Sequence, residues 1–355
     1  MDQKHRPGGS FRPRQLTWLW VVAVAFLWGC AAATTPTPTP TPVPTSTPVT
    51  TPTPEPLNHF DQLLEQRPGA AELERSRELL ALVPASYRAV AHINVAALGE
   101  NPDLRQALGL EQLGPAGALL PLVSNQLSTL VIASSDSEGS AIAVFDGPVN
   151  PESLVQLARG LGVTVAPEPE SYREYQIWRG DAFGLVALAL ALAREDTLVV
   201  VQAPLVQGAT VSPAELVKDS LDSLDNPANS LAAIPPVERM VAILPLELLT
   251  LLYQDCRGIA ELAASIHSIQ WDGCTGAAIS LVAVNGETLT LRMLWTFQTG
   301  VQATTAAALL AGEGIALGGV PLAVVDSRTE GAMLQVQATG EATLILDTIV
   351  GQVQR

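Results

Sequence analysis

The sequence predicts an α+β fold in which antiparallel sheets pack against helices and an internal duplication produces two similar lobes. Three observations support this class. Short runs of alternating apolar residues, separated by turn residues, are typical of strands and hairpins. Amphipathic helical segments lie between these runs. The order strand, helix, hairpin, helix, strands, helix occurs twice along the chain.

The first predicted copy spans residues 84–228 and follows a helical region over residues 57–83, with helices at Leu57–Gln66 and Ala70–Val83. A helix is expected after Asn150, because Pro151 suits the first helical turn and apolar residues recur on one face. A second helix begins at the capping sequence that starts with Ser212. The remaining apolar runs predict strands at Tyr87–Val95, Thr129–Ala133, Ala141–Phe145, Glu174–Trp178 and Leu198–Gln202, and a buried strand or helix at Leu185–Ala193.

The second predicted copy spans residues 229–355. Its strongest local signal is Asn285-Gly286 between two alternating apolar runs, which predicts a hairpin of Ala277–Val284 and Thr288–Phe297. A strand at Glu238–Leu244 and a helix through Leu252 are expected before this hairpin. After it, the pattern predicts a helix at Val301–Ala311, strands at Leu322–Asp326 and Ala332–Ala338, and a helix at Glu341–Val353.

Residues 1–30 have the composition of an export and anchoring segment. Four basic residues precede an apolar run of 18 residues, Leu16–Ala33. Within it, Leu27-Trp28-Gly29-Cys30 resembles the lipobox of bacterial lipoproteins, which implies that Cys30 is acylated and becomes the new N-terminus. Trp28 departs from the small residue usual at its position, so an uncleaved membrane helix is the competing interpretation. Both interpretations place the rest of the chain on the extracytoplasmic side of the cell membrane, because basic residues stay in the cytoplasm.

Residues 31–56 are predicted to form a disordered stalk rich in Thr and Pro. Proline at every second position removes backbone donors and fixes φ, which favours extended polyproline II over helix or sheet. At about 3.1 Å per residue, such a stalk spans on the order of 70 Å. Anchor, stalk and domain therefore follow one another along the chain.

The layout of residues 80–350 also resembles a group of uncharacterised bacterial extracytoplasmic proteins with repeated strand-helix-hairpin-helix units. The resemblance rests on element order and on two segments, Ala143–Gly147 and Trp295–Gly300, in which a strand ends in glycine before a helix. It implies a fold and no activity.

Charge excludes one class of partner. The whole chain has a formal charge of -16, and without the four basic residues and one acid before Cys30 the remainder has 15 basic and 34 acidic residues, a charge of -19. Nucleic-acid binding depends on Lys and Arg that neutralise phosphates, so no nucleic-acid partner is expected. Anionic headgroups would repel this surface, so membrane association is assigned to the N-terminal anchor.

Candidate chemistry is sparse. Cys256 and Cys274 are the two cysteines of the exported part, and a disulfide between them is expected because such bonds persist outside the cytoplasm. His267 has no second histidine at helical spacing, so no metal site or other cofactor is expected. His92 is interpreted as a strand residue on the polar side of a sheet rather than as a catalytic base. The aspartates Asp222 and Asp225 lack the pattern of a calcium loop.

These observations predict a membrane-tethered lipoprotein whose domain is a non-enzymatic binding or scaffold module with a cell-envelope protein as partner. Two alternatives remain open. One is a carrier of lipid or another apolar ligand, held between sheet and helices. The other is an extracytoplasmic hydrolase, which needs His, Asp and Ser to converge in a cleft. The aromatic residues Tyr172, Tyr175 and Trp178 are a candidate contact surface.

Overall fold

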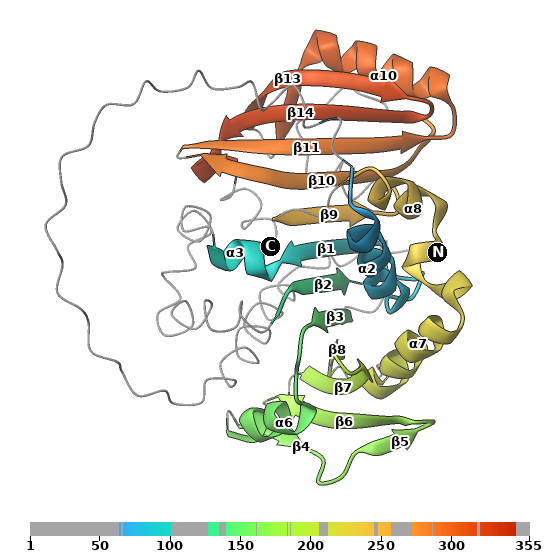
Figure 1. Cartoon of the computed structure of the whole chain (residues 1–355), viewed down its shortest axis with the longest axis vertical. Helices are drawn as coiled ribbons and strands as arrows, with labels where there is room; N and C mark the ends of the chain where they lie inside the picture. Colours follow the sequence, from blue (N-terminus) through green and yellow to red (C-terminus); the bar gives the residue numbers. More distant parts are fainter. Residues whose placement is uncertain are drawn as a thin grey trace, which may run out of the picture.

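The strands in the part of the chain that the structure describes form one antiparallel sheet of 14 strands, with helices on both of its faces (Figure 1). The computed structural model describes Leu64 and residues 67–100, 127–134, 140–160, 162–182, 184, 186–205, 212–244, 248–256, 272–285, 287–317 and 320–345. The predicted α+β class is therefore confirmed. The predicted anchor, stalk and first helix, apart from Leu64, lie outside the described residues.

The N-terminal elements follow the predicted order. Helix α2 (Ala70–Ala81) precedes strand β1 (Ala89–Asn94) and the short helix α3 (Val95–Glu100). Strands β2 (Thr129–Ser134) and β3 (Ala141–Asp146) pair antiparallel, which confirms the first predicted hairpin. Strand β1 pairs with β2, so the three strands are neighbours in the sheet.

Helix α6 (Pro151–Gly160) begins where the sequence predicts, because the Asn150 side-chain oxygen accepts the Ser153 backbone N–H at 3.0 Å. The run Leu185–Ala193 adopts the strand alternative of its prediction. The strands after α6 are β4 (Val163–Val165), β5 (Glu170–Tyr172), β6 (Tyr175–Ala182), β7 (Val186–Arg194) and β8 (Thr197–Pro204).

Helix α7 (Pro213–Asp225) is capped by Ser212, whose hydroxyl accepts the Glu215 backbone N–H at 3.3 Å. Two short 3-10 helices follow, η3 (Pro227–Asn229) and η4 (Leu231–Ala233). Their turns return the chain toward the middle of the sheet, where η4 contacts α2.

The prediction for residues 238–252 was wrong in both of its elements. The expected strand at Glu238–Leu244 is helix α8 (Pro235–Val241), and the expected helix through Leu252 is strand β9 (Leu249–Tyr253). Two prolines fill the first turn of α8, where a missing N–H costs no helical hydrogen bond, and Val237, Met240 and Val241 form its buried side. A short apolar run fits a strand as well as a helix. Residues 249–253 form a strand because they pair with β1 on one side and with β10 (Cys274–Asn285) on the other.

The second predicted hairpin is confirmed. Strands β10 (Cys274–Asn285) and β11 (Thr288–Phe297) pair antiparallel, and β10 also pairs with β9. Helix α10 (Gly300–Glu313) follows, with Thr299 as its N-cap. The last strands are β12 (Ile315–Leu317), β13 (Val320–Glu330) and β14 (Met333–Glu341). Residues 342–345 are helical, and the rest of the expected Glu341–Val353 helix lies outside the described residues.

From one end of the sheet to the other, the strand order is β12, β13, β14, β11, β10, β9, β1, β2, β3, β8, β7, β6, β4, and β5 pairs with β6. Strands β1 and β9 pair antiparallel in the middle. The strands of both predicted copies thus belong to one continuous sheet. We term the strands from β1 to β8 the first half and those from β9 to β14 the second half.

Each face of the sheet is covered by a different set of helices. Helices α2, α7 and α8 pack with the sheet in one hydrophobic cluster, and we term this side the α2 face. Helices α6 and α10 contribute to a second cluster on the opposite side, the α10 face. Neighbouring residues of a strand alternate between the two faces, as in His92 and Ile93 of β1.

Candidate functional site

On the α2 face, residues that are partners on successive strands form a line across the sheet. The line is apolar on one side of the middle of the sheet and polar on the other. In the first half, the residues on this line are Val131, Val144 and Val199, successive partners on β2, β3 and β8. On β1 and through the second half, the line continues through polar residues. We term these the polar row: His92 on β1, Thr250 on β9, Ser280 on β10, Arg292 on β11 and Gln337 on β14.

The polar row is buried. His92 is 5% exposed and the other four residues are at most 1% exposed. Buried polar groups are expensive unless they are hydrogen-bonded. Thr250 and Ser280 meet this requirement by bonding to each other through their hydroxyls at 2.8 Å. For Gln337, neither side-chain amide atom has a hydrogen-bond partner among the described residues.

Arg292 connects the row to the N-terminal side of the domain. Its Nη2 donates to the Gln335 side-chain oxygen at 3.1 Å and to the Leu64 carbonyl at 3.3 Å. Leu64 is itself 1% exposed. We term Leu64 and residues 67–69 the lead-in segment, because they precede α2 directly.

The lead-in segment closes a ring of hydrogen bonds with three strands. Arg67 donates to the Leu64 carbonyl at 2.9 Å and forms an ion pair with Glu330 of β13 at 2.8 Å. Glu330 also accepts from the Gln335 amide at 3.3 Å, and Gln335 of β14 accepts from Arg292 of β11. The ring fastens the lead-in segment to the second half of the sheet.

His92 is electrically neutral in this environment. Burial lowers its pKa to about 4, and the nearby charge of Asp146 opposes the shift only in part. The prediction that His92 is a strand residue is confirmed, since it lies in β1. The expected solvated polar side is wrong, because the side chain is buried on the α2 face. Its Nδ1 has no hydrogen-bond partner among the described residues.

A second polar cluster fastens α2 to the first half of the sheet. Arg75 of α2 forms ion pairs with Asp146 at the end of β3, with Asp196 at 3.2 Å and with Glu78 at 2.8 Å. Its guanidinium also donates to the Thr197 hydroxyl at 3.2 Å. The hydrogen bond to Asp146 is the main reason that the pKa of Arg75 lies above its usual value. Arg75 therefore stays charged and bridges helix and strands.

This second cluster contains Ser, Asp and a nearby His, but not the geometry of a hydrolase triad. The Ser128 hydroxyl donates to the Asp146 carboxylate at 2.5 Å, so the acid contacts the hydroxyl directly. In a triad, a histidine lies between the two and accepts the hydroxyl proton. In the part of the chain that the structure describes, no three His, Cys, Asp or Glu residues are grouped closely enough to hold a metal ion.

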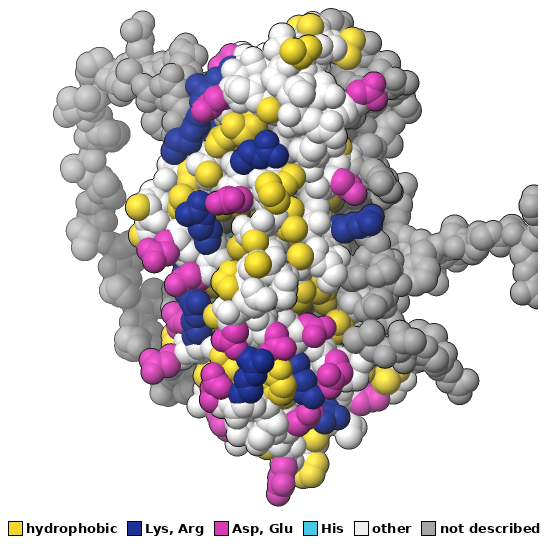
Figure 2. All heavy atoms as spheres, turned by 90° about the vertical axis from the view of Figure 1, so that its right-hand side faces the viewer, with side chains coloured by type: hydrophobic (Ala, Val, Ile, Leu, Met, Phe, Trp, Pro, Cys, Tyr) yellow, Lys and Arg dark blue, Asp and Glu magenta, His cyan; other side chains and the backbone are white. Residues whose placement is uncertain are grey.

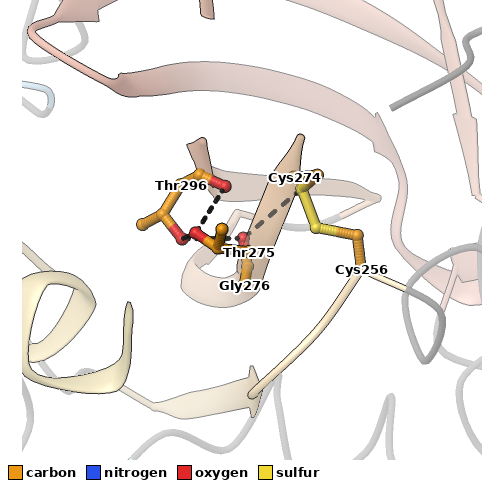
Figure 3. Close-up of a disulfide and its surroundings, with 5 residues drawn as sticks. All are labelled: Cys256, Cys274, Thr275, Gly276 and Thr296. Atoms are coloured by element: carbon orange, nitrogen blue, oxygen red, sulfur yellow. Dashed lines mark hydrogen bonds between the residues drawn. A yellow bond between two sulfur atoms is a disulfide. The ribbon is translucent and has the colours of Figure 1, made fainter. Parts of the chain in front are cut away.

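The disulfide predicted between Cys256 and Cys274 is confirmed, and Figure 3 shows it at the start of β10. The Cα atoms are 6.0 Å apart. Cys256 follows β9 and Cys274 begins β10, so the bond joins neighbouring strands at the same end. A loop of this length contributes on the order of 3 kcal/mol to stability by the chain-entropy model.

Other predicted residues have structural roles or lie outside the described residues. Asp222 and Asp225 of α7 both form ion pairs with Arg173. Figure 2 shows acidic and basic side chains gathered at the lower end of the molecule, which α7 and the β5–β6 hairpin occupy in Figure 1. The lipobox Leu27–Cys30 and His267 lie outside the described residues.

The three aromatic residues do not form one contact surface. Tyr172 and Tyr175 pack against the cluster of the α2 face, whereas Trp178 packs against the cluster of the α10 face. Tyr172 of β5 pairs with Tyr175 of β6 and shares its side of the sheet. Trp178 lies three residues further along β6 and therefore on the other side, since side chains alternate along a strand.

Sequence reasoning did not identify the polar row. The local signals were Arg292 within the apolar run of β11 and two glutamines in β14, namely Gln337 of the row and Gln335, which bonds to Arg292. The row itself depends on the register between strands that are far apart in the sequence.

No protein-family model matches the chain, and no curated protein matches it. Among solved structures, the chain is similar to crystal forms III, IV and I of the protein TP0453, with TM-scores of 0.46, 0.49 and 0.47. The sequence identity is 10% in each case, over 77–78% of this chain and 97–98% of that one. Among the described residues, no helix combines the length and the apolar character needed to cross a membrane.

His92 predicts a specific loss of stability in acid. Because its folded pKa is about 4, the unfolded state takes up a proton below about pH 6.5 that the folded state does not. This contribution destabilises the fold by on the order of 2 to 3 kcal/mol at pH 4.5 and is nearly absent at pH 7.5. Replacing His92→Gln should remove it, so urea unfolding should show a smaller loss between pH 7.5 and 4.5 than in the wild type.

His92→Leu provides the matched comparison, since leucine also takes up no proton but has no polar atom. Both variants should show the same flattening of the pH dependence. Parallel pH profiles for wild type and variants would mean that His92 is protonated equally in the folded and unfolded states.

Proposed function

We propose that the chain is an exported lipoprotein, held at the outer side of the cell membrane through Cys30, whose sheet domain is a non-enzymatic binding or scaffold module. The observation that carries this proposal is the bonding of the lead-in segment to the sheet. A tether transmits load only if its attachment to the domain is firm. The buried Leu64 and the ring through Arg292, Gln335, Glu330 and Arg67 supply such an attachment.

The two attachments of the N-terminal side act on different halves of the sheet. The lead-in segment is bonded to β11 and β13, and Arg75 of α2 is bonded to β3 and to residues at the start of β8. Load that arrives along the stalk is therefore spread over both halves. This arrangement suits a domain that is held in place while a partner binds it.

Exposed apolar side chains support a binding role at one end of the sheet. Six large hydrophobic residues of the described chain are exposed, and five of these lie between residues 301 and 344. Val301 and Leu309 belong to α10, Val324 and Val325 to β13, and Leu344 follows β14. Exposed apolar residues concentrated at one end of a domain are typical of protein contacts.

We also propose that the two halves are copies of one ancestral unit. Moving outward from the central pair, the orders are β1, β2, β3, β8, β7, β6 and β9, β10, β11, β14, β13, β12. In each half, a helix follows the third strand, namely α6 and α10. Strands β4 and β5 have no counterparts in the second half, so they are additions to the first copy.

The tether is tested by the intact mass of the protein extracted from membranes. Wild type should have the mass of a chain that begins at Cys30 and has acyl groups attached. Cys30→Ala should lose both cleavage and acyl groups, whereas Ala33→Ser should keep them. An unprocessed wild-type chain with the same anchoring as Cys30→Ala would replace the lipid anchor by a membrane helix.

The binding role is tested by photo-cross-linking in intact cells. A photoreactive residue in place of Val301, which is 76% exposed in the first turn of α10, should give an adduct with an envelope protein. The matched control is Glu152, an exposed residue at the corresponding position of α6. Equal labelling from both positions, or none from position 301, would contradict a partner at this end of the sheet.

A further inference from the structure

The two ends of the sheet differ in how their backbone groups are used. At one end, β6 is covered by two strands of three residues each, β4 opposite residues 180–182 and β5 opposite residues 175–177. Short edge strands of this kind limit pairing with other chains. At the other end, β12 covers only residues 320–322 of β13.

Residues 323–330 of β13 therefore form an open edge. They pair with β14 on one side, and no described strand pairs with them on the other. Arg328 is partly exposed, and the side chains of the other seven residues are exposed. A long open edge presents unused N–H and C=O groups to any strand that can align with it.

Hydrogen bonding at the hairpin identifies which residues point outward. The Phe297 N–H donates to the Ala332 carbonyl at 2.8 Å, beside the pair of Thr296 with Met333. The backbone N–H and C=O of Met333 therefore point away from β11 and toward its partner Glu330 on β13. Because orientation alternates along a strand, Ser327 and Thr329 direct their N–H and C=O groups to the open edge.

A second contact agrees with this assignment. The Ser327 N–H donates to the neighbouring Asp326 carboxylate at 2.8 Å instead of to a carbonyl of β14. The outward Ser327 N–H is thus satisfied by the side chain of its own neighbour and not by another strand.

We propose that this edge binds the same edge of a second copy, so that two sheets join through antiparallel β13 strands related by a two-fold axis at Ser327. The axis passes through a residue rather than between two, because outward-pointing residues then lie opposite outward-pointing residues and exchange their backbone hydrogen bonds. With Ser327 at the axis, Asp326 of each copy lies opposite Arg328 of the other, on the α2 face. The contact extends to Val325 opposite Thr329.

Charge complementarity selects a second copy as the occupant. The alternation Asp326, Ser327, Arg328 is self-complementary about its middle residue, and opposite charges directly across an antiparallel pair are stabilising. An axis at Arg328 would instead place two arginines opposite each other and Asp326 opposite Glu330. The bulge at Val325 limits regular pairing on that side and so helps to fix the register.

The apolar side chains at this end agree with the same contact. Val324 and Val325 are 39% and 47% exposed, and both lie on the open edge. Pairing of the edges covers them. This contact does not depend on acylation of Cys30.

The test is disulfide cross-linking of the full chain in membranes, in a Cys30→Ser background without other free thiols in the chain. In a hydrogen-bonded antiparallel pair, opposite Cα atoms are about 5.5 Å apart, which a disulfide can span. Ser327→Cys should form a covalent dimer under mild oxidation. Thr329→Cys should form little, because the proposed register places it opposite Val325. Thr164→Cys, an exposed hydroxyl residue on the edge strand β4, is the matched control and should form none.

Charge reversal separates a specific contact from random collision. Asp326→Arg and Arg328→Asp each place like charges opposite each other twice, and each should lower the yield of the Ser327→Cys dimer about ten-fold. The double reversal restores opposite charges and should restore the yield. The proposal is overturned if Ser327→Cys stays monomeric, if it cross-links to another protein instead, or if Thr164→Cys cross-links equally. It is also overturned if the dimer yield does not change when the charges at positions 326 and 328 are reversed.

Discussion

The antiparallel pairing of β1 with β9 is the interaction on which the rest of the structure depends. It joins residues 89–93 to residues 249–253 and turns two groups of strands into one sheet. Without it, the line across the α2 face would end at His92, and α2 and α8 would have no common surface to cover. The strands come from distant parts of the chain, so the loop that joins them adds an entropic cost which the burial on both faces offsets.

The N-terminal side of the domain reinforces this junction. The lead-in segment bonds to β11 and β13 of the second half, and α2 then crosses to the first half, where Arg75 forms ion pairs with Asp146 and Asp196. A buried arginine with a fixed partner geometry favours one position of the segment over others. In the proposed lipoprotein, the same contacts connect the membrane tether to the sheet, so attachment and folding use the same residues.

Local sequence signals predicted most individual elements, and long-range pairing explains what they missed. Asn285-Gly286 and the Asn150 cap act within a few residues, so the β10–β11 hairpin and α6 were predicted correctly. The exchange of strand and helix over residues 238–252 arose because short apolar runs suit both structures until a neighbouring strand is known. The polar row was beyond local reasoning, since Ser280, Arg292 and Gln337 become neighbours only through strand register. The Cys256–Cys274 bond was predictable because few cysteines were available.

Native-state hydrogen exchange of the amides in β1 and β9 tests most directly whether the two halves form one cooperative sheet. The amides of β1 and β9 that bond to each other should exchange only through global unfolding, with the same free energy as the best protected amides of β3, β8, β11 and β14. Exchange that is much faster in β1 and β9 than in the middle of either half would show that the halves separate while each remains folded. That result would contradict the account of a single sheet held together at its centre.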